Sequence, residues 1–163
     1  MIQYTLRDIH KRPLFTAAID CYEGASDAVK KGLAAEWAVE NGRSLEWADL
    51  SGASLRFAVL RDVDLSGADL SGADLRDADL SNANLIVAVL RDADLSGAGL
   101  IGACLIGAYL SGADLIGAYL SDANLLGAYL NDAKLEKADF EGAILRKAKG
   151  INPTSDIFKG ALL

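Results

Sequence analysis

The chain has 163 residues, of which 52% are hydrophobic, and its formal net charge at pH 7 is −7. No apolar run approaches the roughly 18 residues of a membrane span, and the N-terminal residues lack the basic and apolar regions of a signal peptide, so we expect one cytoplasmic domain without a membrane partner. The acidic balance disfavours direct binding to nucleic acid, because phosphate contacts require clustered Lys and Arg.

Thiol and imidazole groups are scarce in this chain. Cys21 and Cys104 lie in different sections, and His10 is the only histidine. A disulfide framework needs more cysteines, and a zinc site needs Cys or His at ligand spacing. We therefore expect two free thiols, no metal site and no cofactor.

The N-terminal residues have the pattern of a β-hairpin. Ile2, Tyr4 and Leu6 alternate with polar residues, as half-buried strands do. A looser alternation over 15–19 follows a polar stretch, and Pro13 in that stretch suits a turn. The pattern predicts two antiparallel strands joined by this turn.

Residues 26–41 have the pattern of an amphipathic helix. Val29, Leu33 and Trp37 are four residues apart, so they would form one apolar stripe on a helix, widened by Ala34 and Ala38. Ser26 suits the N-cap position, where its hydroxyl accepts a hydrogen bond from an early helical N–H. The pattern predicts one helix in front of the main repeat.

From residue 46 to residue 150 a five-residue unit repeats without a gap. The centre of each unit from Leu50 to Leu145 is Leu, with Phe140 as the exception, and the residue two before the centre is usually Ala. A five-residue spacing matches neither a helix nor a strand and indicates a solenoid of stacked units. Gly, Asp or Asn often follows two residues after the centre, where a tight turn needs positive φ. Leu and Ala are therefore predicted to point inward.

The run over 68–85, ADLSGADLRDADLSNANL, resembles the pentapeptide-repeat family, whose unit is written A(D/N)LXX. The resemblance covers 46–150. It implies an all-β solenoid, the right-handed quadrilateral parallel β-helix, in which four units make one coil. The repeat region would then have about five coils.

The segments on either side of the repeat are predicted to cap it, which gives three parts: 1–45, 46–150 and 151–163. A β-helix has an unpaired edge at each end, and an uncovered edge invites association. The hairpin and helix would cover the first coil, and this arrangement resembles phage and prophage members of the family. The C-terminal tail would cap the last coil, with a docking strip for a partner subunit as the alternative.

If one coil has twenty residues, then residues twenty apart stack on one side of the rod. Asp74, Asp94 and Asp114 would form an acidic strip with a spacing of about 4.8 Å. One interpretation is a negative surface that imitates the phosphates of duplex DNA. The other is a solvated face, because Asp favours turns by accepting hydrogen bonds from nearby backbone N–H groups.

The same stacking predicts two apolar columns at positions that are usually polar in the repeat. We call these six residues the candidate interface: Ile86, Val89, Ile106, Tyr109, Leu126 and Tyr129. Contiguous exposed apolar surface is typical of protein interfaces, and Tyr is a favoured anchor there. Stacking between coils without a partner is the alternative interpretation.

No catalytic constellation is present in the sequence, so we expect no enzyme. The first hypothesis is a non-catalytic scaffold that binds a protein partner or a second copy of itself. The family resemblance adds a second one, because some pentapeptide-repeat proteins imitate duplex DNA, bind DNA gyrase and protect it from quinolones. Residues 46–100 fit this with ten acidic and four basic side chains, but 101–150 are nearly neutral, with six and five. The scaffold therefore ranks first.

Overall fold

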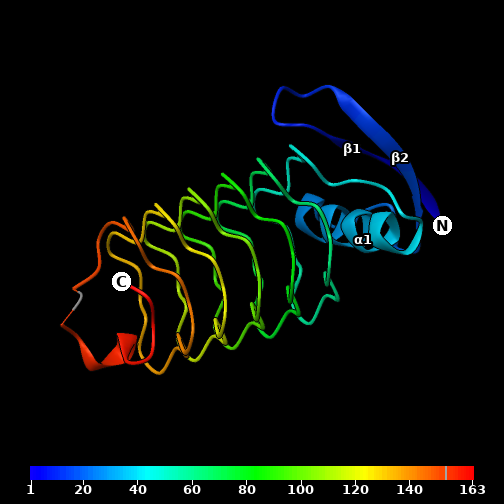
Figure 1. The fold of residues 1–163 in the computed structure, drawn as a ribbon. Coiled ribbons are helices and arrows are strands. Elements are labelled where there is room, and N and C mark those ends of the chain that lie inside the picture. The colour runs from blue at the N-terminus through cyan, green and yellow to red at the C-terminus, as the bar shows by residue number, and fades with distance from the viewer. Residues whose placement is uncertain (153) are drawn as a thin grey trace.

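The computed structural model describes residues 1–152 and 154–163. A hairpin and a helix lie at one end of a long stack of coils, and a short 3-10 helix lies at the other end (Figure 1). Among the described residues, no helix is long and apolar enough to cross a membrane. The regular elements are β1 (Ile2–Arg7), β2 (Pro13–Ile19), α1 (Asp27–Glu40) and η1 (Asp156–Phe158).

β1 and β2 form the predicted antiparallel hairpin. Ile2 pairs with Ile19 and Leu6 with Phe15, so the apolar side chains of the two strands share a face. The prediction that Pro13 lies in the turn is wrong, because it is the first residue of β2. A proline is tolerated there, since the first residue of a strand need not donate to the ladder.

The helix α1 is present, and most of the predicted stripe faces the core: Leu33 and Trp37 pack against it, and Ala34 and Ala38 are buried, but Val29 is not. Ser26 caps the helix by accepting a hydrogen bond from the Val29 N–H at 3.3 Å. Val29 is 39% exposed, whereas the buried face consists of Ala and Gly together with Lys31. The reason is a close approach to the first coil: a methyl group on Gly32 would overlap with the carbonyl oxygen of Ser54. Only small side chains fit such a contact.

The repeat region winds with a period of twenty residues. Isolated parallel bridges join residues twenty apart, as between Asp74 and Asp94. Each bridge carries backbone hydrogen bonds such as Leu75 N–H to Asp94 O at 2.8 Å. The predicted turn residues do have positive φ. The core is a ladder of buried Leu and Ala, so the inward prediction agrees with the structure, and the first ladder residue is Leu45, one unit earlier than expected.

Both flanking segments contact the end coils. At the N-terminal end, Asp49 N–H donates to Arg7 O at 2.8 Å and Ser54 N–H donates to Ala28 O at 3.0 Å. At the C-terminal end, Leu162 forms a parallel bridge with Ile144. The ring of Phe158 lies 5.1 Å from that of Phe140 and is buried against the core. The polar groups at the coil edges are thus partly satisfied by these segments.

Candidate functional site

The structure brings the six residues of the candidate interface together. Parallel bridges join Val89 to Tyr109 and Tyr109 to Tyr129, so the three lie on successive coils of one side. The two Tyr rings stack with centroids 5.0 Å apart and an interplanar angle of 13°. All three side chains are half-buried. Their ring faces therefore stabilise one another while part of each remains accessible.

The other three residues of the candidate interface stack at the adjoining corner. Val87 N–H donates to Ile106 O, and Gly107 N–H donates to Leu126 O, both at 3.0 Å. Val87 itself is 40% exposed and has φ of 50°, a conformation that a β-branched residue rarely adopts. The apolar surface thus continues from one side of the rod around its corner.

Two cations that were not predicted from the sequence border the Tyr column. The Lys149 ammonium lies 4.1 Å from the centre of the Tyr129 ring, and the Arg91 guanidinium lies 5.3 Å from that of Tyr109. Both distances are in the range of a cation–π interaction. The twenty-residue period could have indicated Lys149, because it follows Tyr129 in the same column.

The acidic strip is stacked as predicted, but its carboxylates have basic partners. Arg76 donates two hydrogen bonds to Asp74, at 2.7 and 2.6 Å, and lies 3.6 Å from Asp94. Lys134 contacts Asp114 at 2.9 Å. The hydrogen bonds from Arg76 hold the pKa of Asp74 below its usual value. Three carboxylates thus face two cations, which leaves little of the bare negative surface that the sequence suggested.

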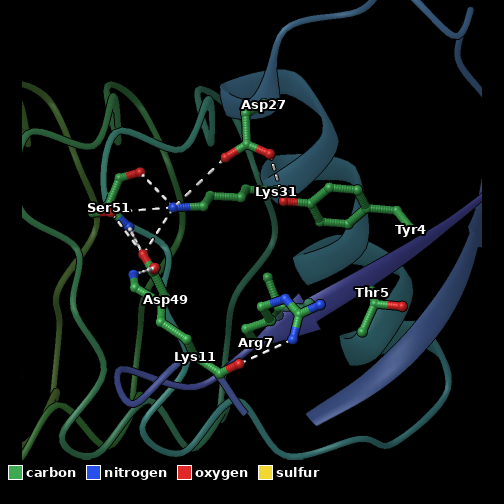
Figure 2. A pocket seen from close by; sticks show the side chains of 9 residues that line it. Tyr4, Thr5, Arg7, Lys11, Asp27, Lys31, Asp49 and Ser51 are labelled. Atoms are coloured by element: carbon green, nitrogen blue, oxygen red, sulfur yellow. Dashed lines mark hydrogen bonds and ion pairs between the residues drawn. The ribbon is translucent and has the colours of Figure 1, made fainter. Parts of the chain in front are cut away.

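A cluster of charged residues that the sequence analysis missed lines a cavity of about 420 Å³ between β1, α1 and the first coil (Figure 2). The Lys31 ammonium contacts Asp49 at 2.8 Å and donates to the backbone and hydroxyl oxygens of Ser51. Lys11 also donates to Asp49. Asp27 accepts a hydrogen bond from the Tyr4 hydroxyl at 2.7 Å. The hairpin, the helix and the first coil each supply some of these side chains, so no local sequence motif predicts the cluster.

The two charges at the centre of this cluster, those of Lys31 and Asp49, are buried and paired. Lys31 is 9% exposed and Asp49 is 7% exposed. Burial raises the pKa of Asp49, but the hydrogen bonds from Lys11, Lys31 and Ser51 outweigh burial and hold it well below the usual value. The cluster therefore joins the hairpin and helix to the repeat. Within residues 1–152 and 154–163, no group of three or more His, Cys, Asp or Glu side chains is arranged to hold a metal ion.

Three overlapping stretches, residues 44–77, 73–112 and 108–146, match the family model described as "Pentapeptide repeats (8 copies)". The chain belongs to the pentapeptide-repeat family. Proteins of this family are right-handed quadrilateral β-helices. The matched stretches begin next to Leu45, the first residue of the buried ladder.

Solved structures of pentapeptide-repeat proteins are among those similar to this chain. Rfr23 from the cyanobacterium Cyanothece 51142 is 36% identical over 61% of this chain and 63% of its own, with a TM-score of 0.40. A thylakoid-lumen protein of Arabidopsis thaliana is 30% identical over 66% and 69%, with a TM-score of 0.32. QnrB1, a plasmid-mediated fluoroquinolone resistance protein, is 21% identical over 71% and 64%, with a TM-score of 0.47.

The chain spans less than two thirds of the length of Rfr23. No curated protein matches its sequence significantly. Nothing among these similar structures supports the expected likeness to phage and prophage members. A proposal about what this chain binds must therefore rest on its own surface geometry.

Proposed function

We propose that the protein is a non-catalytic scaffold that binds a protein through the candidate interface. The observation that carries this proposal is the stacked column of Val89, Tyr109 and Tyr129, continued at the corner by Ile86, Ile106 and Leu126. Aromatic side chains on a rigid support lose little conformational entropy when a partner covers them. A ladder of backbone hydrogen bonds between coils supplies that rigid support.

We further propose that 46–150 forms about five coils, and that 1–45 and 151–163 cap its two ends. The twenty-residue bridges support the coil number. Hydrogen bonds from Asp49 and Ser54 to the preceding segments support the N-terminal cap, and the bridge from Ile144 to Leu162 supports the C-terminal one. Capped ends would leave the sides of the rod as its binding surface.

Site-specific photo-crosslinking tests the proposed function. A photoreactive phenylalanine analogue at Tyr109 is expected to form protein adducts in the cells that produce the protein, with the second copy or with another protein. Ile106→Glu should abolish these adducts, because it places a charge in the apolar surface.

The matched control is the same analogue at Tyr119, half a coil away and 54% exposed. Adducts at Tyr109 that exceed those at Tyr119 and disappear with Ile106→Glu support the proposal. Equal yields at the two positions would contradict it.

DNA mimicry is the second candidate, and the stacking of Asp74, Asp94 and Asp114 on one side of the rod favours it. Their pairing with Arg76 and Lys134 weakens it. A gyrase supercoiling assay, with and without a quinolone, tests DNA mimicry when purified protein is titrated into it. We expect no effect at micromolar protein. Inhibition or protection that is lost when the three Asp become Asn would instead establish mimicry.

A further inference from the structure

We infer that the candidate interface binds the same surface of a second copy, with the two rods antiparallel and Tyr109 near the two-fold axis. This inference rests on the proposed function and names its partner. It follows from the order of charged and apolar residues along one side of the rod.

The order of residues in the Tyr column is self-complementary. Parallel bridges place Asp69, Val89, Tyr109, Tyr129 and Lys149 on five successive coils. The column therefore has an acid at one end, a base at the other and apolar side chains between them. In an antiparallel pair centred on Tyr109, each Asp69 faces Lys149 of the second copy, and each Val89 faces Tyr129 of the second copy.

The order of residues at the corner that precedes this column is also self-complementary. Ile86, Ile106 and Leu126 lie on the coils of Val89, Tyr109 and Tyr129. A two-fold axis perpendicular to the rods keeps each corner opposite its own counterpart in the other copy. Ile106 then faces Ile106, and Ile86 faces Leu126, so the apolar contact is continuous.

The corner on the other side of the column holds charges of both signs. Backbone hydrogen bonds from Asp92 to Ser111 and from Gly112 to Asn131 stack this corner on three successive coils. Arg91 lies at its first level and Asp132 at its third. In the antiparallel arrangement these two levels face each other, so Asp132 of the second copy lies opposite both Arg91 and its neighbour Asp92. The attraction to Arg91 is offset by the repulsion from Asp92, and this corner does not oppose the pair.

All four of these charged side chains are without an ion-pair partner among the described residues. Asp69, Arg91, Asp132 and Lys149 make no salt bridge, and Lys149 and Arg91 lie over Tyr rings instead. On the other sides of the rod some bases pair with carboxylates, as Lys134 does with Asp114, whereas Lys137 makes no salt bridge among the described residues. The Asp69 carboxylate and the Lys149 ammonium are therefore free to pair with a second copy.

The charge order also selects the direction of the second copy. In a parallel pair, Asp69 would face Asp69 and Lys149 would face Lys149, and like charges across an interface oppose binding. The antiparallel pair replaces both repulsions with attractions. An isologous two-fold contact of this kind is the commonest form of homo-oligomer.

The contact is short, so we expect a weak dimer. Four coil steps from Asp69 to Lys149 span about 19 Å. A surface of this length buries less than the roughly 800 Å² per partner of a standard interface. We therefore expect a dissociation constant on the order of micromolar.

Disulfide crosslinking in a Cys21→Ser, Cys104→Ser background tests the register. Tyr109→Cys is expected to form a disulfide dimer on mild oxidation, because the two-fold axis brings the two copies of residue 109 together. Val89→Cys and Tyr129→Cys should crosslink only when the two variants are mixed. A parallel pair would instead crosslink Val89→Cys alone. Tyr119→Cys, on the opposite side, is the control and should stay at background.

Charge reversal tests the same arrangement without cysteines. Asp69→Lys or Lys149→Asp alone should weaken dimerisation by roughly tenfold in sedimentation, because each reversal affects two symmetric ion pairs. The double variant should regain the wild-type dissociation constant. A monomer at all concentrations, or crosslinking of Val89→Cys alone, overturns this inference. If the protein is a monomer at all concentrations but Tyr109 forms adducts with a different protein, this inference fails and the proposed function stands.

Discussion

Leu95→Asp is expected to abolish cooperative folding of the repeat region. Leu95 is 0% exposed, and its N–H donates to Asp114 O on the next coil at 2.7 Å. The change removes about 1.5–3 kcal/mol of apolar burial and places a carboxyl group where nothing can solvate it. We expect the free energy of unfolding to fall by more than about 4 kcal/mol. Each coil contacts only its neighbours, so a defect in the middle separates the two halves.

Ile101→Asp is the matched control, because it makes the same kind of substitution in a side chain that is 47% exposed. A surface substitution of this kind should change stability by less than about 1 kcal/mol. Thermal and urea unfolding followed by circular dichroism distinguishes the two variants. A Leu95→Asp protein that unfolds at the wild-type midpoint would show that this side chain does not face the core.

The repeat was predictable from sequence because one local pattern recurs on every coil. A residue such as Leu95 needs only the five-residue spacing to be placed inside, and Tyr109 and Tyr129 need only the twenty-residue period to be stacked. An error in placing one unit does not shift the units that follow, because the repeat has no gap and every unit has the same length. The candidate interface and the acidic strip were therefore placed correctly on their sides of the rod, while their roles remain proposals.

The contacts that the sequence did not reveal depend on distances between segments. Hydropathy predicts that Val29 faces the core, but the approach of α1 to Ser54 admits only small residues there. The pairing of Arg76 with Asp74 and Asp94 depends on side-chain conformations that no period determines. The Lys31–Asp49 contact joins residues from a helix and a coil, and their relative placement follows from packing.

Asp49→Asn is expected to loosen the hairpin and helix from the repeat while leaving the repeat folded. Asp49 accepts hydrogen bonds from Lys11 and Lys31, and Lys31 is itself buried. Removing one partner of a buried ion pair costs about 3 kcal/mol, mainly because the remaining charge stays out of water. Asp69→Asn is the matched control, since Asp69 lies in the same column and makes no ion pair among the described residues.

Trp37 makes the hairpin and helix visible separately from the repeat when Trp47 is replaced by Phe. The chain has Trp37 on α1, stacked on Phe15 of β2, and Trp47 on the first coil. In Asp49→Asn, the fluorescence transition should precede the loss of circular dichroism by several degrees. A loss of about 3 kcal/mol in the free energy of unfolding lowers the melting temperature of a small unit by that much. Coincident transitions in this variant would mean that the two parts unfold as one unit and that the cluster does not hold them together.

The contact of the hairpin and helix with the repeat, here called docking, should depend on pH. This dependence tests the same ion pairs independently. The pKa of Asp49 is depressed in the folded protein, so its contribution is complete above the unfolded value of about 3.9 and is lost as the pH falls through the folded value. Below about pH 4 the unfolded chain binds a proton that the docked one does not, which favours undocking. Asp8 and Asp74 have lowered pKa values as well, so wild type must be compared with Asp49→Asn. The difference in docking stability should shrink as the pH falls, and a difference independent of pH would contradict this assignment.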